Sequence, residues 1–326
     1  MRDVSSALSR RSWLPAISVV VPAHNEAAGL ALFHQRLTRA LSGIDNWEVV
    51  YIDDGSRDAT LAVVESLRRS DDRVAVVSLS RNFGKEVAIT AGLDHAAGDA
   101  VVVIDADLQD PPEVIPELIA QWRAGFDMVY AKRRSRTGDS WLKRGTARGF
   151  YRLMQRMGDL KLPEDTGDFR LMSRRVVDAV RQLREQHRFM KGLFAWVGYP
   201  TTYVTYDRKP RCAGASKWSY WKLWNLALEG ITSFTVMPLK LAAYVGLGVA
   251  LLSVIYAAQV IVKTLIIGNP VAGYPSLMTV VLFLGGIQLM FLGVIGEYLG
   301  RVFNETKQRP LYLVERYIPS AVKVSV

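Results

Sequence analysis

The chain has 326 residues, of which 50% are hydrophobic, and its formal net charge is +10. This length is enough for one sizeable domain with an extension, and the basic excess favours anionic partners such as phosphates, an acidic membrane surface or nucleic acid. The single cysteine, Cys212, excludes an internal disulfide and fits a reducing compartment. Residues 1–15 carry three arginines and no apolar core, so we expect a loose N-terminal tail there rather than a signal peptide.

An alternation of apolar runs and helical periodicity begins after this tail. We predict buried strands at 17–21, 49–52, 74–79, 101–104 and 128–131, separated by helices. Strands that alternate with helices in this way form a parallel sheet with right-handed crossovers. The sequence therefore predicts an α/β fold with a mostly parallel sheet.

The first four of these strands end in polar loops, which should lie along one rim of the sheet. In open α/β sheets, ligands bind outside the carboxyl ends of the strands. The residues that we expect on this rim are Glu26, Asp53, Asp54, Lys85, Asp105 and Asp107. The turn after the first strand contains no glycine, so a dinucleotide fingerprint is missing, and no P-loop occurs; both observations disfavour hydride chemistry and P-loop phosphate binding.

The loop after the fourth strand carries the strongest chemical signal. Asp105 and Asp107 are spaced i, i+2 and are followed by Gln109. Hard oxygen donors on one loop suit Mg²⁺ or Mn²⁺, which are usually held by one or two carboxylates plus substrate phosphates. The alternative is a polar loop that caps the next helix, with Asp110 as N-cap before Pro111. We expect Asp110 to be that cap, but the cap leaves Asp105 and Asp107 unexplained, and for these two residues we favour the metal site.

A strongly basic segment follows, from residue 133 to residue 156. Arg144, Arg148 and Arg152 are spaced i, i+4, i+8 and share one helix face, where like charges repel. The run is either a solvated helix face or an anion site, and we favour the anion site because a bound anion relieves the repulsion. Asp168, at the start of another short strand, is either a turn residue or a site residue.

The C-terminal part has the composition of a membrane anchor. We expect a helix over 219–232 with Trp221 and Trp224 on one face, as in helices that lie at a membrane interface. Two uncharged stretches follow, and we predict spans at 241–262 and 276–296, since a bilayer needs about 20 apolar residues per helix. The flanks outside the hairpin are basic, so the positive-inside rule places both termini in the cytoplasm. These basic residues are Lys217, Lys222, Lys240, Arg301, Lys307 and Arg309.

Five motifs in this order resemble family 2 glycosyltransferases with the GT-A fold. They are Pro22-Ala23-His24-Asn25-Glu26, Asp53-Asp54-Gly55-Ser56, Asn82-Phe83-Gly84-Lys85, Asp105-Ala106-Asp107-Leu108-Gln109 and Thr166-Gly167-Asp168-Phe169-Arg170. The two spans and the stretch Gly214-Ala215-Ser216-Lys217 narrow the resemblance to polyisoprenyl-phosphate glycosyltransferases, similar to bactoprenol glucosyltransferases and dolichyl-phosphate mannose synthase. The resemblance covers residues 15–310. The Gln-x-x-Arg-Trp motif of processive synthases is missing, which argues against polymer synthesis.

The resemblance implies a Rossmann-like nucleotide-sugar-binding domain with a mostly parallel sheet, followed by interfacial amphipathic helices and a two-helix transmembrane hairpin. We therefore expect an N-terminal tail at 1–15, a cytoplasmic glycosyltransferase domain at 16–215, a juxtamembrane amphipathic helix at 216–240, two transmembrane helices within 241–300, and a cytoplasmic tail at 301–326.

The resemblance also implies site residues. Those that would bind the nucleotide sugar are Pro22, His24, Glu26, Asp53, Lys85, Asp105, Arg211 and Lys217. Those that would hold Mg²⁺ or Mn²⁺ are Asp105, Asp107 and Gln109, and those that would bind the acceptor phosphate are Arg133, Arg144 and Arg148. Asp107 and Asp168 would be catalytic, Asp168 either as a base or as an orienting group.

The expected function is an inverting, metal-dependent transfer of one sugar, glucose from UDP-glucose, to undecaprenyl phosphate at the cytoplasmic face of the bacterial inner membrane. Two alternatives are another donor, GDP-mannose or a UDP-amino sugar, and a non-catalytic membrane-anchored nucleotide-binding scaffold. The intact carboxylate motif argues against the scaffold. We expect a nucleotide sugar, a polyprenyl phosphate lipid, the membrane and further copies of the chain as partners, and no nucleic acid, because the hairpin places much of the basic surface at a membrane.

Overall fold

The computed structural model describes residues 16–134, 166–207, 237–267 and 273–322. The chain divides into two compact units, each of which is described by itself below. The first comprises Met1–Gln155, Leu160–Ser219 and Pro310–Val326, and the second consists mainly of Tyr220–Arg309. The predicted strands fall in the first unit and the predicted spans in the second.

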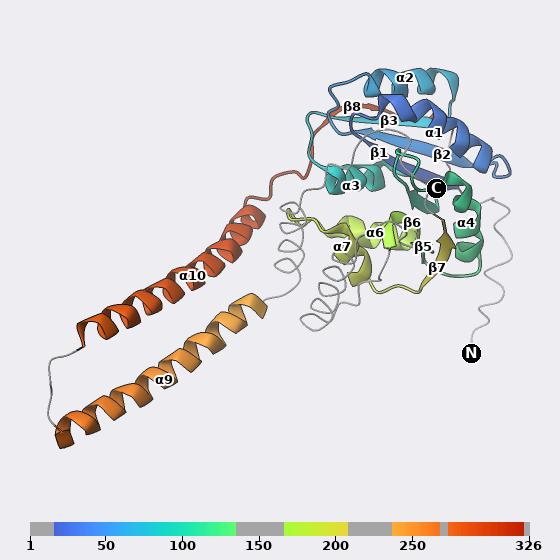
Figure 1. The fold of residues 1–326 in the computed structure, drawn as a ribbon. Helices are drawn as coiled ribbons and strands as arrows, with labels where there is room; N and C mark the ends of the chain where they lie inside the picture. The colour runs from blue at the N-terminus through green and yellow to red at the C-terminus, as the bar shows by residue number, and fades with distance from the viewer. Residues whose placement is uncertain (1–15, 135–165, 208–236, 268–272, 323–326) are drawn as a thin grey trace. The chain divides into compact units, whose positions relative to one another are not determined.

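The described residues of the first unit form an eight-stranded sheet in the order β7-β5-β6-β4-β1-β2-β3-β8 (Figure 1). The strands are β1 (Ile17–Ala23), β2 (Trp47–Asp53), β3 (Val74–Leu79), β4 (Ala100–Val103), β5 (Met128–Arg133), β6 (Thr166–Ser173), β7 (Thr201–Tyr206) and β8 (Val314–Ile318). Strands β4, β1, β2 and β3 are parallel neighbours, and β5 is parallel to β7, whereas β6 and β8 run antiparallel to their neighbours. The predicted α/β fold with a mostly parallel sheet is confirmed.

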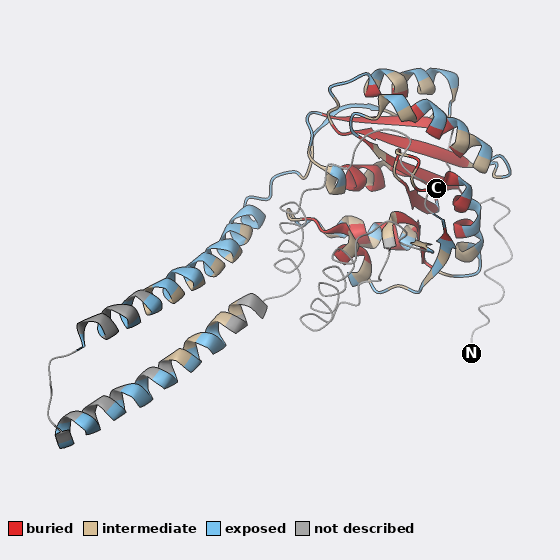
Figure 2. Ribbon diagram, in the orientation of Figure 1, coloured by how far each residue is buried: buried red, intermediate tan, exposed pale blue. Residues whose placement is uncertain are grey.

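Helices cover both faces of this sheet (Figure 1). They are α1 (Ala27–Ala40), α2 (Thr60–Ser70), α3 (Lys85–His95), α4 (Ile115–Arg123), α6 (Arg174–Gln182) and α7 (Met190–Trp196). Helices α1, α2 and α4 share one apolar core with alternate residues of the central strands, such as Val19 and Val21. Helix α3 packs on the other face, where a Cβ added to Gly92 would lie 2.2 Å from Cγ1 of Val20. The central strands are therefore largely apolar on both faces, and almost all of their residues are buried (Figure 2).

Strand β8 lies within 301–326, the segment expected to be a C-terminal tail. It pairs antiparallel with β3, with Val76 opposite Ile318. Oγ of Ser320 donates a hydrogen bond to Oε2 of Glu48 at 2.8 Å, and Arg316 forms an ion pair with Glu65 at 2.5 Å. Residues Val314–Ile318 of the expected tail thus form an edge strand of the sheet, because the edge of β3 offers unpaired backbone groups and β8 pairs with them.

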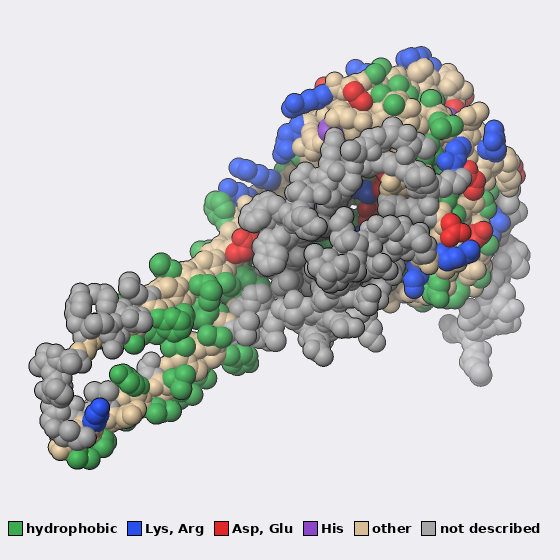
Figure 3. All heavy atoms as spheres, viewed as in Figure 1, with side chains coloured by type: hydrophobic (Ala, Val, Ile, Leu, Met, Phe, Trp, Pro, Cys, Tyr) green, Lys and Arg blue, Asp and Glu red, His purple; other side chains and the backbone are tan. Residues whose placement is uncertain are grey.

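The second unit contains the helices α9 (Met237–Ile267) and α10 (Tyr274–Thr306), which include both predicted spans. Large apolar side chains are exposed along both helices (Figure 3). By length and composition, the described residues contain one segment apolar enough to cross a membrane, Phe283–Thr306, and a shorter apolar stretch at Ala242–Tyr256. The expected interfacial helix at 219–232 lies outside the described residues.

Candidate active site

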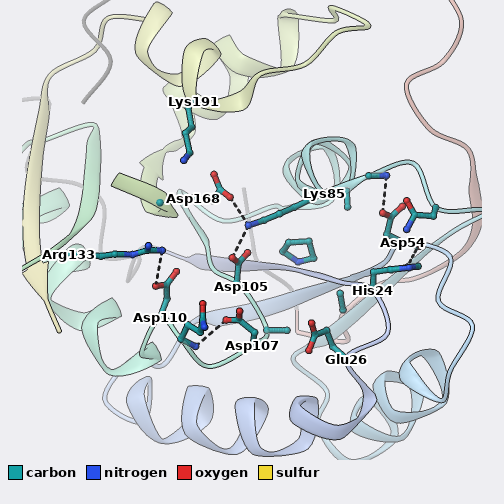
Figure 4. A pocket seen from close by; sticks show the side chains of 18 residues that line it. His24, Glu26, Asp54, Lys85, Asp105, Asp107, Asp110, Arg133, Asp168 and Lys191 are labelled. Atoms are coloured by element: carbon teal, nitrogen blue, oxygen red, sulfur yellow. Dashed lines mark hydrogen bonds and ion pairs between the residues drawn. The ribbon is translucent and has the colours of Figure 1, made fainter. Parts of the chain in front are cut away.

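A cavity of about 700 Å³ opens at the carboxyl ends of β1 to β4 (Figure 4). The loops after these strands line one side, and β6 and α7 line the other. The predicted site residues that line it are Pro22, His24, Glu26, Lys85, Asp105, Asp107, Gln109, Arg133 and Asp168. These residues come from five separate segments of the sequence, and Glu26, Lys85, Asp105 and Asp107 among them are residues that the rim argument places together.

Asp53 is not among the residues that line the cavity, and Asp54 takes that place. The carboxylate of Asp53 is buried and accepts hydrogen bonds from the backbone N–H of Ser56 at 3.3 Å and from Oγ of Ser78 at 3.5 Å. The remaining predicted site residues, Arg144, Arg148, Arg211 and Lys217, lie outside the described residues.

Asp54 joins the loops that follow β1, β2 and β3. Its carboxylate accepts hydrogen bonds from the backbone N–H groups of Phe83 and Gly84 at 2.7 and 3.0 Å. Nδ1 of His24 lies 2.8 Å from its carbonyl oxygen. Gly55 follows in the left-handed region, at φ +59°, and an added Cβ would lie 2.4 Å from the carbonyl carbon of Arg81. A glycine is required here because the two loops approach each other so closely.

Lys85, the first residue of α3, lies between two carboxylates. Its Nζ is 2.7 Å from Oδ2 of Asp105 and 2.6 Å from Oδ2 of Asp168 (Figure 4). Desolvation opposes the charge of Lys85, but the two carboxylates outweigh it and raise the pKa of its ammonium group above the ordinary value. Lys85 therefore stays charged and ties the loop after β4 to strand β6.

The loop after β4 has an unusual backbone at Leu108, which lies in the left-handed region at φ 61° and has a buried side chain. This turn keeps Leu108 in the core while Asp107 and Gln109 line the cavity, with the backbone N–H of Gln109 donating to Oδ1 of Asp107 at 3.1 Å. Non-glycine residues adopt this conformation mainly where the surroundings hold them in it.

The donor set on this loop suits a divalent cation that also binds phosphate. In the described part of the chain, no three acidic, histidine or cysteine side chains cluster as a metal cage. Asp105, Asp107 and Gln109 supply two carboxylates and one amide at the cavity. Mg²⁺ and Mn²⁺ are commonly bound by so few protein oxygens, with the remaining positions filled by phosphates and water. The residues present therefore fit such an ion when a diphosphate shares it.

Asp110 does not cap the following helix, so that part of the sequence interpretation is wrong. Pro111 precedes the short 3₁₀ helix Pro112–Val114, which has no side-chain cap. Asp110 is instead buried, accepts a hydrogen bond from the hydroxyl of Tyr206, and lies 3.9 Å from a guanidinium nitrogen of Arg133. The carboxylate of Asp110 thus interacts with side chains from β5 and β7 rather than with the backbone of the helix that follows it.

Asp168 enters the cavity from β6. Its Oδ2 pairs with Lys85, whereas its Oδ1 is buried and has no hydrogen-bond partner. Burial opposes ionisation of this group, but the charges of Lys85, Lys191 and Arg170 lower the pKa of its carboxyl far below the ordinary value. The surrounding positive charges therefore favour the anionic form of Asp168, which makes this carboxylate a weak base.

Arg170 is a site residue that sequence reasoning did not single out. Its guanidinium group is buried and donates to the carbonyl oxygens of Gly167 and Asp168 at 2.7 and 3.2 Å. It also lies over the ring of Phe194, 4.1 Å from the centroid. The sequence does contain a signal for this role, which is an arginine in a buried strand two residues after Asp168. Because a buried charge needs partners, such an arginine indicates polar contacts inside the fold.

Lys191 is the second residue that the sequence did not reveal. It lines the cavity from α7 and points toward Asp168 (Figure 4). Nothing in the short segment around it forms a motif, so no local signal distinguished this lysine from a surface lysine.

Comparison with known proteins identifies two regions of the chain. The sequence profile described as "Glycosyl transferase family 2" matches residues 18–181, and the profile described as "GtrB C-terminal hairpin" matches residues 237–302. An uncharacterized glycosyltransferase of Synechocystis sp. is 54% identical over 299 residues, which cover 91% of this chain and 94% of that protein.

The second relative is a bactoprenol glucosyl transferase derived from prophage SfII of Shigella flexneri. It is 52% identical over 302 residues, which cover 92% of this chain and 97% of that protein. Among solved structures, a glucosyl-3-phosphoglycerate synthase from Mycobacterium tuberculosis gives a TM-score of 0.46 at 20% identity, over 67% of this chain and 76% of that chain.

Proposed function

The chain belongs to glycosyltransferase family 2, and we propose that it transfers one glucose from UDP-glucose to undecaprenyl phosphate at the cytoplasmic face of a bacterial inner membrane. The reaction class follows from the family. The proposed acceptor rests on the 52% identity to a bactoprenol glucosyl transferase over 302 residues, a similarity that extends through the hairpin. The glucosyl donor rests on the same relative.

The donor would bind where the loops after β1 to β4 meet. His24, Glu26 and Asp54 line that side of the cavity, and Asp105, Asp107 and Gln109 would hold Mg²⁺ or Mn²⁺ beside the diphosphate. When bound, the cation supplies a Lewis acid that stabilises negative charge on the leaving nucleoside diphosphate. Lys85 adds a fixed positive charge next to the same loop.

Asp168 would act as an orienting and electrostatic group rather than as a base. A phosphate monoester has its second pKa near 6 and is largely dianionic at neutral pH, so the acceptor needs little deprotonation. The strongly lowered pKa of Asp168 makes it a poor proton acceptor. Its negative charge is instead suited to stabilise the sugar carbon as that carbon loses its bond to the diphosphate. A single displacement inverts the anomeric centre, so an α-linked donor gives a β-linked lipid.

Binding two anions in one cavity requires positive charge. Arg133 lines the cavity beside Asp110, which supports its proposed contact with the acceptor phosphate. For Arg144 and Arg148 the support is the sequence pattern, in which one helix face carries several like charges. For Arg211 and Lys217 it is the family resemblance.

We propose that α9 and α10 cross the membrane as a hairpin, with both ends on the cytoplasmic side. Strand β8 follows α10 and pairs with β3, which precedes α9 in the chain. Because two strands of one sheet lie on the same side of a membrane, the intervening segment crosses it an even number of times. The match of residues 237–302 to a C-terminal hairpin supports two crossings. The expected homo-oligomer stays a prediction, which light scattering of the purified chain tests.

The function is tested with purified full-length protein, undecaprenyl phosphate, Mg²⁺ or Mn²⁺, and a panel of UDP-glucose, GDP-mannose and UDP-amino sugars. We expect a β-linked glucosyl lipid from UDP-glucose. If a lipid-linked product forms only from another nucleotide sugar, the proposed donor is wrong and the proposed reaction class stands. If no donor yields a lipid-linked sugar, while the protein still binds nucleotides, the acceptor assignment is wrong.

A further inference from the structure

Lys191 is a cation in the cavity that the donor chemistry does not use. It belongs to α7, on the opposite side from the loop after β4 (Figure 4). In the part of the chain that the structure describes, its ammonium group makes no hydrogen bond and no ion pair within 4 Å. Burial lowers the pKa of Lys191, and the nearby charge of Asp168 only partly offsets this effect. A partly desolvated charge of this kind is stabilised when an anion binds beside it.

The other cations that line the cavity have partners. Lys85 pairs with both Asp105 and Asp168. Arg133 donates a hydrogen bond to the hydroxyl of Tyr206 at 3.3 Å and lies beside Asp110. Among the described residues, Lys191 is therefore the cavity cation whose charge is least compensated by a partner, so it can act with Arg133 in binding a substrate anion.

The position of Lys191 is fixed by its helix. The backbone N–H of Met190 donates to Oε2 of Glu86 at 3.3 Å, which joins the start of α7 to α3. The ring of Phe194 packs against the guanidinium group of Arg170, which also holds the backbone of Asp168. Arg170 thus contacts both the helix that carries Lys191 and the backbone of Asp168, which sets the place of α7 beside the proposed reacting centre.

We propose that Lys191 binds the phosphate of the lipid acceptor. This inference rests on the proposed function, which supplies a phosphate monoester as the nucleophile. The diphosphate of the donor is assigned to the side of Asp105, Asp107 and Lys85, and Lys191 lies across the cavity from them. Two anions that must react are thereby bound by separate positive groups, with Asp168 between them.

The step needs no proton transfer. One oxygen of the dianionic phosphate forms the new bond to the anomeric carbon while the bond from that carbon to the donor diphosphate breaks. The electron pair leaves with the nucleoside diphosphate, and the lipid product is a phosphodiester with one negative charge. Lys191 would hold the attacking phosphate and reduce its repulsion from the diphosphate.

Calorimetry tests the contact directly, with the full chain in detergent and a short-chain polyprenyl phosphate as the ligand. A charge-assisted contact to a partly desolvated phosphate predicts that Lys191→Met weakens binding of this ligand by about tenfold or more. Lys191→Arg should retain most of the affinity. UDP binding should change less than about twofold in both variants, because the diphosphate has other partners.

Two controls separate charge from structure. Lys132→Met removes a lysine from β5 that lies over the ring of Tyr203 and does not line the cavity, and it should bind both ligands like the wild type. The uncharged polyprenol should bind wild type and Lys191→Met equally, since only the phosphate contact is lost. If Lys191→Met proves unstable, Lys191→Gln provides the same comparison with a polar side chain of similar length.

Three results would overturn the inference. They are equal affinity of wild type and Lys191→Met for polyprenyl phosphate, an equal loss for the phosphate and the polyprenol, or a loss confined to UDP. If the wild type transfers glucose to the lipid and Lys191→Met keeps the wild-type affinity for the acceptor, the role of Lys191 is wrong and the proposed function stands. If the wild type neither binds polyprenyl phosphate nor glycosylates it, the proposed function is wrong as well.

Discussion

Nζ of Lys85 lies 2.6 Å from Oδ2 of Asp168, so a lysine at the start of α3 holds a carboxylate of β6. The same nitrogen pairs with Asp105 on the loop after β4. These three residues come from distant parts of the sequence, and their contacts connect the proposed donor side of the cavity with its opposite wall.

The ion pairs of Lys85 predict that Lys85→Met lowers turnover by about tenfold to a hundredfold. Without the ammonium group, Asp105 and Asp168 face each other uncompensated, and the orientation of Asp168 is lost. Steady-state kinetics with saturating donor and acceptor measure the effect. Arg69→Met, on the exposed end of α2, is a control without a place in the cavity. Normal turnover by Lys85→Met would show that these ion pairs are dispensable.

The second prediction concerns Asp107. Asp107→Asn should abolish turnover and leave the melting temperature within about 2 °C of the wild type, because the residue lines a cavity rather than the core. Chelation by EDTA should stop wild-type turnover, and Mg²⁺ or Mn²⁺ should restore it. Activity that survives both treatments would remove the divalent cation from the mechanism.

The third prediction concerns Glu86, whose pKa is raised to about 7 by burial and by the charge of Asp168. In the unfolded chain this carboxyl ionises near its ordinary value of 4.5, so the folded state holds the proton over a wider pH range. Stability is therefore lost as the pH rises from about 4.5 to about 7, and the loss is constant above that range.

Glu86→Gln removes this titration. Its melting temperature relative to wild type should rise from pH 5 to pH 7.5 and then stay constant. Glu117→Gln, at an exposed position of α4, should show no such trend. A difference for Glu86→Gln that does not vary with pH would mean that the carboxylate is ionised in the folded state throughout.

Strand β8 should stabilise the catalytic unit. Truncation before Pro310 removes the pairing with β3 and the contact of Ser320 with Glu48, and it exposes a sheet edge. We expect a melting temperature lower by several degrees and a stronger tendency to aggregate, measured by thermal scanning with light scattering. Removal of residues 323–326 alone should have little effect. Equal stability of the two truncated chains would show that β8 contributes nothing.

The topology is tested by cysteine labelling in intact cells, in a Cys212→Ser background. A reagent that does not cross the membrane should label cysteines placed between Asn269 and Tyr274 and should not reach Ser320→Cys until the cells are opened. The shared sheet puts Ser320 on the same side as β3, and the positive-inside rule applied to the basic flanks predicts that this side is the cytoplasm. Labelling of Ser320→Cys from outside would overturn the proposed orientation.

Much of the fold could be derived from the sequence because its signals are local. Apolar runs ending in polar loops defined β1 to β4, and uncharged stretches defined the two long helices. The carboxyl ends of parallel strands must share a rim, so the separated motifs could be assigned to one site before any contact was known. The ordered motifs also identified the family, which the profile matches confirm.

Other features depended on which strands are neighbours and which way side chains face. The position of β6 between β4 and β5 brings Asp168 to Lys85, and no local pattern specifies that strand order. The local signal that suggested a cap at Asp110 was outweighed by a buried hydroxyl and a guanidinium group from β7 and β5.

Asp53 and Asp54 illustrate the same limit at one strand end. Asp53 is the last residue of β2 and contacts Ser78, whereas Asp54 is the first residue of the loop that follows and lines the cavity. The sequence by itself determined that an acidic pair ends this strand. Only the packing of the neighbouring loops decided which acid faces the cavity, just as only the placement of α7 brought Lys191 to Asp168, because both depend on contacts between segments far apart in the chain.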